Sequence, residues 1–320
     1  MHKKVDLIKS SKQLKRCIDK PKKYALISID NLAFTIPVPK KLVKQLYKIS
    51  SLRTADVSVK LRSLDYHERY CQKYKKKFLV SFSNGSTLSV FCYGLNEKMN
   101  QVKIEFNPNT VGYDNIDFIF NYLRELFGEQ RMFDWLQRSK VTSIHYAVDF
   151  PFIPFRHIVV DYAYSPKYES FSDVDSGTIS TIRFGNKSGC PIIIYDKVCE
   201  QKGSYRNYSE YVRLEKQHRP QQRGRKSMFT LAELDKQKYS FQGIIFYDPN
   251  ILNRMPDRVL DLIREYGIGR AKDLLQQKDK VKLLQLMVKY RLPHTKKAKA
   301  EIVNAFQLDL LKLKNLILKL

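Results

Sequence analysis

Short runs of β-branched and aromatic residues, broken by turn-forming residues, dominate the first third of the chain. They predict strands at residues 25–37, 78–82, 87–93 and 102–106. The residues SNGS between the second and third runs are typical of a hairpin turn. Pro39 opens a short basic helix after the first strand. From Asp114 to Phe127 the apolar spacing becomes that of a helix, which Gly128 ends.

A second group of predicted strands lies between about residues 141 and 248. These strands occupy residues 144–150, 179–184, 191–195, 211–215 and 241–247. Turns rather than regular helices join them, which favours an antiparallel sheet. After residue 250 the pattern is helical and leucine-rich, with basic segments 271–289 and 296–320 on either side of Pro293.

The pattern as a whole predicts an α+β fold. We expect a domain over residues 1–250 with a mostly antiparallel β-sheet flanked by helices, followed by a smaller basic helical domain over residues 251–320.

The net charge of the chain indicates which kind of molecule it binds. Lys and Arg number 58 against 32 Asp and Glu, which gives a net charge of +26. Such self-repulsion is relieved by a polyanion, either nucleic acid or an anionic membrane. No stretch approaches the ~20 apolar residues of a spanning helix, and the basic N-terminus lacks the hydrophobic core of a signal peptide. We therefore expect a nucleic-acid partner and no membrane role. Five scattered cysteines without a CxxC pair predict reduced thiols and a cytoplasmic location.

Candidate chemistry rests on acids placed inside predicted strands, because GxxxxGK[ST], GxGxxG and HExxH do not occur. In IHYAVDF, His145 and Asp149 share one strand face, ~13 Å apart. Glu105 lies in the middle of VKIEF, and Glu215 shares a strand face with Arg213. Carboxylates in mid-strand are suited to a hard divalent cation. Surface salt bridges, such as one from Glu215 to Arg213, are the alternative.

One tyrosine ends an apolar strand. The segment GNKSGCPIIIYDK leads from a turn through a strand to Tyr195. A phenol oxygen at the rim of a sheet can attack a phosphodiester if a metal polarises the phosphate and a basic group lowers the phenol pKa. Lys197 or His145 could supply the positive charge or take the proton. Since the chain has 20 tyrosines, a core tyrosine with one hydrogen bond is the alternative.

A basic stretch follows at residues 213–226, RLEKQHRPQQRGRK. Arg and Lys interleaved with Gln can bind phosphates while the amides reach base edges, although a solvated loop has the same composition. The predicted DNA-binding residues are Arg213, Lys216, Arg219, Arg223, Arg225 and Lys226.

Taken together, these segments resemble the replication initiation factor (Rep-trans) family. That family includes initiators of rolling-circle plasmids, filamentous-phage initiators and relaxases of conjugative elements. The resemblance rests on ISIDNLAFTIPVP, VKIEFNP, SIHYAVDF, and GTISTIRFGNKSGCPIIIYDKVCE followed by YVRLEKQHRP, in the family's order over roughly residues 25–220. The closing pair, a Y-[DN]-K strand followed by an R-x-E strand, is its most specific part.

The resemblance implies metal-dependent nicking of one DNA strand at a replication origin of a bacterial plasmid or other mobile element. Tyr195 then matches the nucleophile, which stays on the 5′ end and leaves a 3′ hydroxyl. Asp149, Glu215 and Glu105 match metal-ligand positions for Mg²⁺ or Mn²⁺. Tyr211, on the strand face of Glu215, is the second candidate nucleophile, ahead of Tyr205 and Tyr208 in SYRNYSEY.

Further implications concern charge and partners. Lys197 and Arg213 would offset phosphate charge. The resemblance also implies a host helicase and a homodimer.

The chain departs from the family pattern at two residues of one strand. His145 stands in place of the family's first Asp, and Ser143 in place of its Arg. This departure leaves open a divergent or inactive member, and together with the charge of +26 it supports the alternative of a sequence-specific DNA-binding protein without catalysis. A relaxase of a conjugative element would use the same chemistry as a replication initiator. RNA binding is a weaker alternative, because no aromatic RNA-recognition motif is present.

Overall fold

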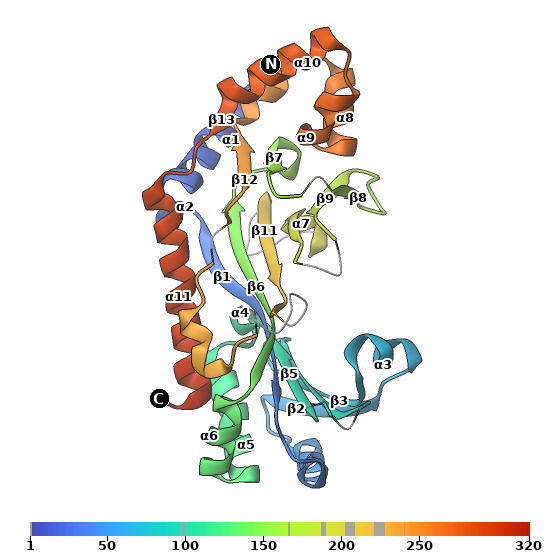
Figure 1. Ribbon diagram of the computed structural model, residues 1–320, viewed down its shortest axis with the longest axis vertical. Coiled ribbons are helices and arrows are strands. Elements are labelled where there is room, and N and C mark those ends of the chain that lie inside the picture. Colours follow the sequence, from blue (N-terminus) through green and yellow to red (C-terminus); the bar gives the residue numbers. More distant parts are fainter. Residues whose placement is uncertain are drawn as a thin grey trace. The chain divides into compact units, whose positions relative to one another are not determined.

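The computed structural model describes residues 2–96, 98–99, 101–165, 167–186, 190–201, 209–220, 228–239 and 241–320. Two compact units are built from interleaved segments of the chain. Unit 1 contains the residues up to Ile27, Tyr146–Gln217 and Tyr239–Ala305; unit 2 contains Ser28–His145, His218–Lys238 and Phe306–Leu320. Helices and strands both contribute, so the α+β class is confirmed (Figure 1).

Unit 2 is an antiparallel sheet with helices. Its strands follow one another in the order β2-β3-β4-β5-β1. The bounds are β1 Leu26–Ile36, β2 Val57–Ser63, β3 Tyr74–Phe82, β4 Thr87–Gly94 and β5 Val102–Phe106. The helices of this unit are the 3-10 helix η1 Lys40–Ser51, α3 Tyr66–Gln72, α4 Pro108–Val111, α5 Tyr113–Phe127, α6 Glu129–Gln137 and the 3-10 helix η5 Leu231–Lys236.

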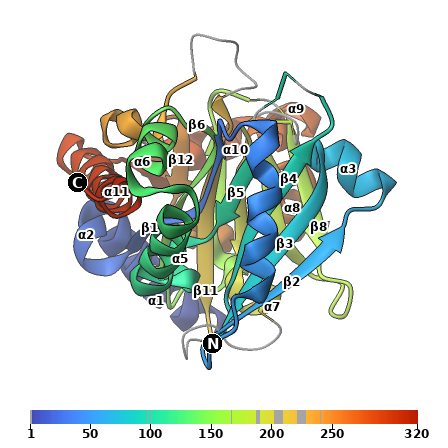
Figure 2. The ribbon, with the colours of Figure 1, turned by 90° about the horizontal axis from the view of Figure 1, so that it is seen from below.

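Helix α5 covers the sheet of unit 2 with the apolar stripe that its sequence predicts. Phe120 is fully buried, and its ring stacks on Phe34 of β1 with centroids 6.1 Å apart. The same ring meets Phe106 of β5 edge-on. Helices α5 and α6 lie side by side, joined at Gly128 (Figure 2).

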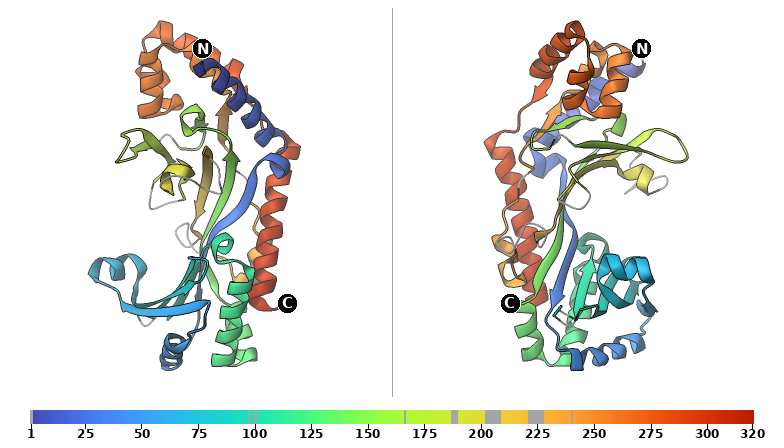
Figure 3. Two further views of the ribbon diagram at one scale, coloured as in Figure 1. Left: turned by 180° about the vertical axis from the view of Figure 1, so that it is seen from behind. Right: turned by 45° about the vertical axis from the view of Figure 1, so that its right-hand side comes forward.

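Unit 1 holds the remaining described strands. Strands β6 Lys140–Pro151, β11 Tyr211–His218, β10 Ile192–Asp196, β9 Ile179–Phe184 and β8 Tyr168–Ser172 are neighbours in that order, and β6 begins in unit 2. A second, three-stranded sheet has the order β13-β12-β7, with β13 Arg291–Leu292, β12 Ile244–Tyr247 and β7 Val159–Tyr162. Figure 3 shows the paired strands β8 and β9 in yellow-green.

The helices of unit 1 come from both ends of the chain. They are α1 His2–Asp19, α2 Pro21–Tyr24, the 3-10 helix η2 Phe155–His157, α7 Lys197–Glu200, the 3-10 helix η6 Pro249–Arg254, α8 Asp257–Tyr266, α9 Ile268–Leu274 and α10 Gln277–Tyr290. Helix α11, Lys296–Leu318, continues from unit 1 into unit 2. The two units divide the chain at places other than residue 250, and the boundary at that residue stays a prediction.

Several elements follow the sequence closely, and others do not. Strands β1, β4, β5 and β9 and helices α5 and α11 lie within a residue or two of their predicted bounds. Helix α1 was not predicted, although Leu7, Leu14 and Ile18 are buried at helical spacing. Strands β2, β7 and β8 were missed because their patterns are short or mostly polar.

No helix among the described residues is long and apolar enough to span a membrane.

A glycine between α8 and α9 yields the first prediction. Gly267 has φ +77°, and a Cβ there would lie 2.5 Å from the Tyr168 ring. Gly267→Ala should therefore lower the free energy of unfolding by about 1–3 kcal/mol through backbone strain, and further through this contact. Gly85→Ala is the matched control, because Gly85 has φ +78° with open space around it. Urea unfolding that shows equal losses for both variants would exclude the contact with Tyr168.

A buried histidine predicts a pH dependence of stability. Burial, with Lys299 nearby, lowers the pKa of His294 to about 4. The unfolded chain binds this proton near pH 6.5, so stability is complete above that pH and falls as the pH drops toward 4. His294→Phe should reduce the slope by up to about 1.4 kcal/mol per pH unit in unfolding experiments between pH 6.5 and 4. An unchanged slope would show that folding does not lower the pKa of His294.

Candidate active site

Strands β10 and β11 place the candidate residues by their register. Tyr195 pairs with Arg213, and Ile193 pairs with Glu215. Paired side chains of an antiparallel ladder lie on the same face, so Tyr195, Arg213 and Glu215 share one face of unit 1. Tyr211 lies on this face too, because it is two residues from Arg213.

Asp149 lies at the centre of a buried polar cluster in unit 1. Its two carboxylate oxygens accept hydrogen bonds from Nε and Nη2 of Arg213, at 2.6 and 2.7 Å. The Tyr211 hydroxyl donates to Asp149 Oδ2 at 3.1 Å. Asp149, Arg213 and Tyr211 are each at most 2% exposed. A two-pronged guanidinium–carboxylate contact of this kind satisfies both charges and holds β6 and β11 together.

Tyr195 and Glu215 form a second contact beside this cluster. The Tyr195 hydroxyl donates to Oε2 of Glu215 at 3.2 Å, and Gln217 donates to Oε1 at 3.0 Å. Tyr195 is 9% exposed and Glu215 is 5% exposed. The Lys197 ammonium lies 5.4 Å from the centre of the Tyr195 ring and is also paired with Glu200. A phenol, its hydrogen-bond acceptor and a cation are thus in one place.

The remaining predicted acid lies in unit 2. Glu105 Oε2 is 2.7 Å from Lys103 Nζ, and Asn31 donates to its other oxygen. Burial raises the pKa of Glu105, but Lys103, Asn31 and the charge of His145 outweigh this effect, and the pKa lies below its ordinary value. His145 is half-buried and contributes to the electrostatics of Glu105.

The predicted metal site can be tested against the donor groups. Among the described residues, no three His, Cys, Asp or Glu side chains gather into a group that could hold a metal ion. Asp149 directs both oxygens at Arg213, and both Glu215 oxygens accept from protein donors. In this arrangement the described side chains do not fit a resident divalent cation, and Mg²⁺ or Mn²⁺ stays a prediction from the resemblance.

The predicted DNA-binding residues are separated by the alternation of β11. Arg213 is bound to Asp149, while Lys216 is buried on the opposite face with its ammonium 5.5 Å from the centre of the Tyr162 ring. Arg219, just after the strand, is half-buried. Arg223, Arg225 and Lys226 lie outside the described residues, as do Tyr205 and Tyr208.

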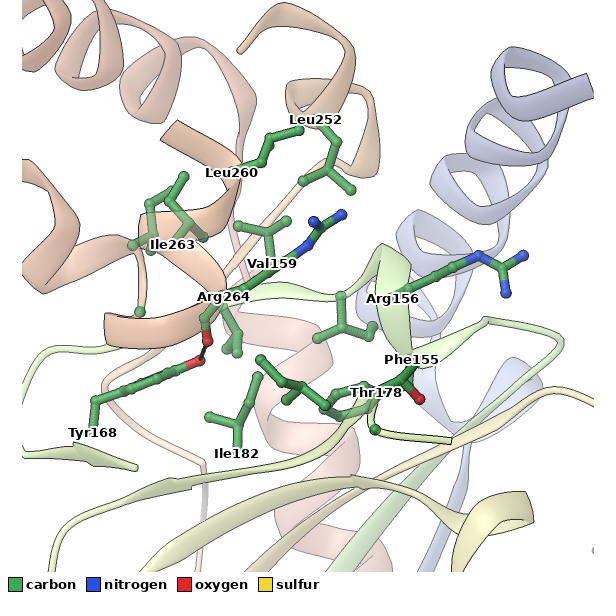
Figure 4. A pocket seen from close by; sticks show the side chains of 16 residues that line it. Phe155, Arg156, Val159, Tyr168, Thr178, Ile182, Leu252, Leu260, Ile263 and Arg264 are labelled. Carbon is green, nitrogen blue, oxygen red and sulfur yellow. Dashed lines mark hydrogen bonds between the residues drawn. The ribbon is translucent and has the colours of Figure 1, made fainter. Parts of the chain in front are cut away.

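Unit 1 also contains a cavity of about 460 Å³, on the other face of the sheet. Ile182 of β9 lines it, together with Leu260 and Ile263 of α8 (Figure 4). Ile182 pairs with Ile194, and Thr181 pairs with Tyr195, so alternation places Tyr195 away from this cavity. The apolar lining suits packing or an apolar ligand and does not contribute to the Tyr195 site.

Sequence reasoning missed one residue of the cluster. Gln217, the partner of Glu215, was grouped with the basic stretch as a possible base reader. Its place two residues after Glu215 on the same strand face was the signal that could have identified it.

Comparison with solved structures gives a distant likeness. A solved structure described as the rolling circle replication initiator protein from Geobacillus stearothermophilus is 15% identical to this chain, with a TM-score of 0.35. The match covers 89% of this chain and 96% of the chain in that structure. No protein-family model and no curated protein matches the chain. At this level of similarity the likeness assigns no activity to the chain.

The Asp149–Arg213 pair yields a prediction about stability. Asp149→Asn leaves the Arg213 charge buried without its counter-charge, so the free energy of unfolding should fall by about 3–5 kcal/mol. The exposed pair of Asp261 and Arg264 offers the control, because Asp261→Asn should change it by about 1 kcal/mol or less. A loss below 1 kcal/mol for Asp149→Asn in urea unfolding would mean that Arg213 has sufficient other partners.

Proposed function

We propose that this protein is an origin-specific DNA-nicking and strand-transfer protein of rolling-circle replication. Tyr195 is the proposed nucleophile, and a covalent 5′-phosphotyrosine is the proposed intermediate. The observation that carries the proposal is the hydrogen bond from the Tyr195 hydroxyl to Glu215, beside the Lys197 ammonium. The Y-D-K and R-x-E segments that resemble the replication initiation factor family supply these same residues.

The contacts of the cluster divide the tyrosines by role. Tyr211 is fully buried and donates to Asp149, which Arg213 already binds, so the Tyr211 hydroxyl has a structural role. Tyr195 is less buried, and it donates to Glu215, whose other oxygen accepts from the Gln217 amide. The geometry therefore favours Tyr195 over Tyr211 as nucleophile.

In the proposed step, the Tyr195 oxygen forms a bond to the scissile phosphorus and the bond from phosphorus to the 3′ oxygen breaks. The phenol proton passes to Glu215, which acts as the general base, and the leaving 3′ oxygen takes a proton from solvent. Lys197 offsets the charge that develops on the phosphate. Attack of a 3′ hydroxyl on the phosphotyrosine reverses the step and transfers the strand.

Partners and cofactor follow from the same proposal. The net charge of +26 favours DNA as the partner, and the single strand at the nick is the substrate. Dependence on Mg²⁺ or Mn²⁺, a host helicase, a homodimer and a cytoplasmic location are parts of the proposal that come from the resemblance and the composition. A relaxase of a conjugative element would use the same chemistry on a transfer origin.

A sequence-specific DNA-binding protein without catalysis is the second candidate. Two observations favour it: the family's first acid is His145 here, and Asp149 is occupied by Arg213. Such a protein would bind DNA with a strong salt dependence and leave it uncut.

The nucleophile can be tested on supercoiled DNA of the element that encodes the protein. Incubation with Mn²⁺ and denaturing electrophoresis should show a 5′ strand linked to the protein, absent when EDTA replaces the metal. Tyr195→Phe should remove this product by at least about 100-fold, because the phenyl ring has no oxygen to attack the phosphate, and should leave DNA binding intact.

Tyr211→Phe is the matched control, since it removes a hydroxyl from the same face of the sheet. It should retain the covalent product at a level near that of the unchanged protein. Loss of the product in Tyr211→Phe but not in Tyr195→Phe would make Tyr211 the nucleophile in place of Tyr195. DNA that is bound but uncut under all conditions would establish the second candidate function.

A further inference from the structure

The hairpin of β8 and β9 exposes one aromatic ring on the face that carries Tyr195. Phe171 is 41% exposed, whereas Tyr168 on the same strand turns inward and packs edge-on against buried Phe184. The Arg183 guanidinium carbon lies 4.6 Å from the centre of the Phe171 ring. An exposed ring held by a guanidinium is a flat, preordered surface rather than part of the core.

Register places this ring in line with the candidate nucleophile. Phe171 pairs with Thr181, and Thr181 pairs with Tyr195. The three side chains therefore share one face on three adjacent strands, which separates Phe171 from Tyr195 by about 10 Å. The register shifts between Phe171 and Ser172, and irregularities of this kind re-aim side chains near functional sites.

Charges around the ring suit a phosphate backbone. Glu169 accepts from Arg183 at 3.1 Å and lies 2.9 Å from Lys167 Nζ, so one carboxylate is shared by two cations. These three side chains together carry a charge of +1, and Asp173 and Asp175 follow in the turn of the hairpin. A base-sized aromatic surface beside a positive charge is the combination by which proteins bind single-stranded nucleic acid without reading its sequence.

We propose that Phe171, supported by Arg183, is a stacking platform for a DNA base one or two nucleotides from the phosphate that Tyr195 attacks. The proposal rests on the proposed nicking function and extends it. The single strand crosses β10, β9 and β8, with its scissile phosphate at Tyr195 and a neighbouring base on Phe171. The platform orients the substrate and is not part of the chemical step.

Binding without cleavage tests the platform directly. In a Tyr195→Phe background, a fluorescein-labelled single strand that spans the mapped nick is titrated by fluorescence anisotropy. Phe171→Ala should weaken binding roughly fivefold to 100-fold, and Phe171→Leu nearly as much, because a leucine fills space but does not stack. Phe171→Trp should keep the affinity or improve it. Val174→Ala is the control and should change nothing, since Val174 is 97% exposed on the same hairpin.

A second readout separates stacking from a structural role. Oligonucleotides with an abasic site at each position near the nick should lose affinity at one position, one or two nucleotides from the scissile phosphate. That loss should disappear in Phe171→Ala and remain in Val174→Ala. Should Phe171→Ala fail to fold, Phe171→Leu takes its place in this comparison.

Each outcome bears on the platform separately from the nicking reaction. Equal affinities for Phe171→Leu and Phe171→Trp, or abasic losses that persist in Phe171→Leu, would overturn the platform even if Tyr195 forms the covalent product. Where no nick exists to be mapped, a mixed-sequence 20-nucleotide strand replaces the probe. If Phe171→Leu binds that probe more weakly, the stacking platform is upheld although the nicking function fails. If the affinity is unchanged, the stacking platform is overturned as well.

Discussion

The buried contact between Asp149 and Arg213 is the constraint on which the candidate site depends. Two opposite charges that are almost completely removed from water are tolerated only with close geometry and satisfied hydrogen bonds, which the paired contacts of 2.6 and 2.7 Å provide. The pair sets β6 against β11 at one register. A slip of one residue would turn Arg213 to the apolar face and leave Asp149 as an unpaired buried charge.

Because of this register, the two faces of the sheet in unit 1 carry different kinds of side chain. On one face, Tyr195 and Glu215 meet beside the buried ion pair, and Phe171 is exposed further along the sheet. On the other face, Ile182 and Ile194 contribute to the apolar interior. The polar cluster and the apolar packing thus use alternate residues of the same strands, so the cluster is held by a core that takes no part in it.

The carboxylates of the protein differ in what they can do because their partners differ. Asp149 is neutralised by a guanidinium, and Glu105 by the Lys103 ammonium. Glu215 accepts hydrogen bonds from the Tyr195 phenol and the Gln217 amide. Of these three acids, Glu215 is the one that accepts from the candidate nucleophile Tyr195. A resemblance of motifs alone had grouped all three as equivalent metal ligands, and the contacts distinguish them.

Local patterns in the sequence by themselves determined much of the fold and placed Tyr195 at the end of an apolar strand, while its candidacy as nucleophile came from the family resemblance. Alternation marked β5 and β9, helical spacing marked α5, and the apolar run that ends at Tyr195 marked the tyrosine at the end of β10. These features depend on neighbouring residues and on the period of a strand or helix.

Only the tertiary structure decided which side chains meet. Asp149 and Arg213 are 64 residues apart in the chain, and Tyr195 and Glu215 are 20 residues apart. Their contacts follow from strand order and register, which no short segment encodes. The same holds for Phe171, whose strand β8 is too short and polar to be recognised from its sequence and is defined by its pairing with β9. A strand pattern states which residues share a face, and the partner strand decides what that face contacts.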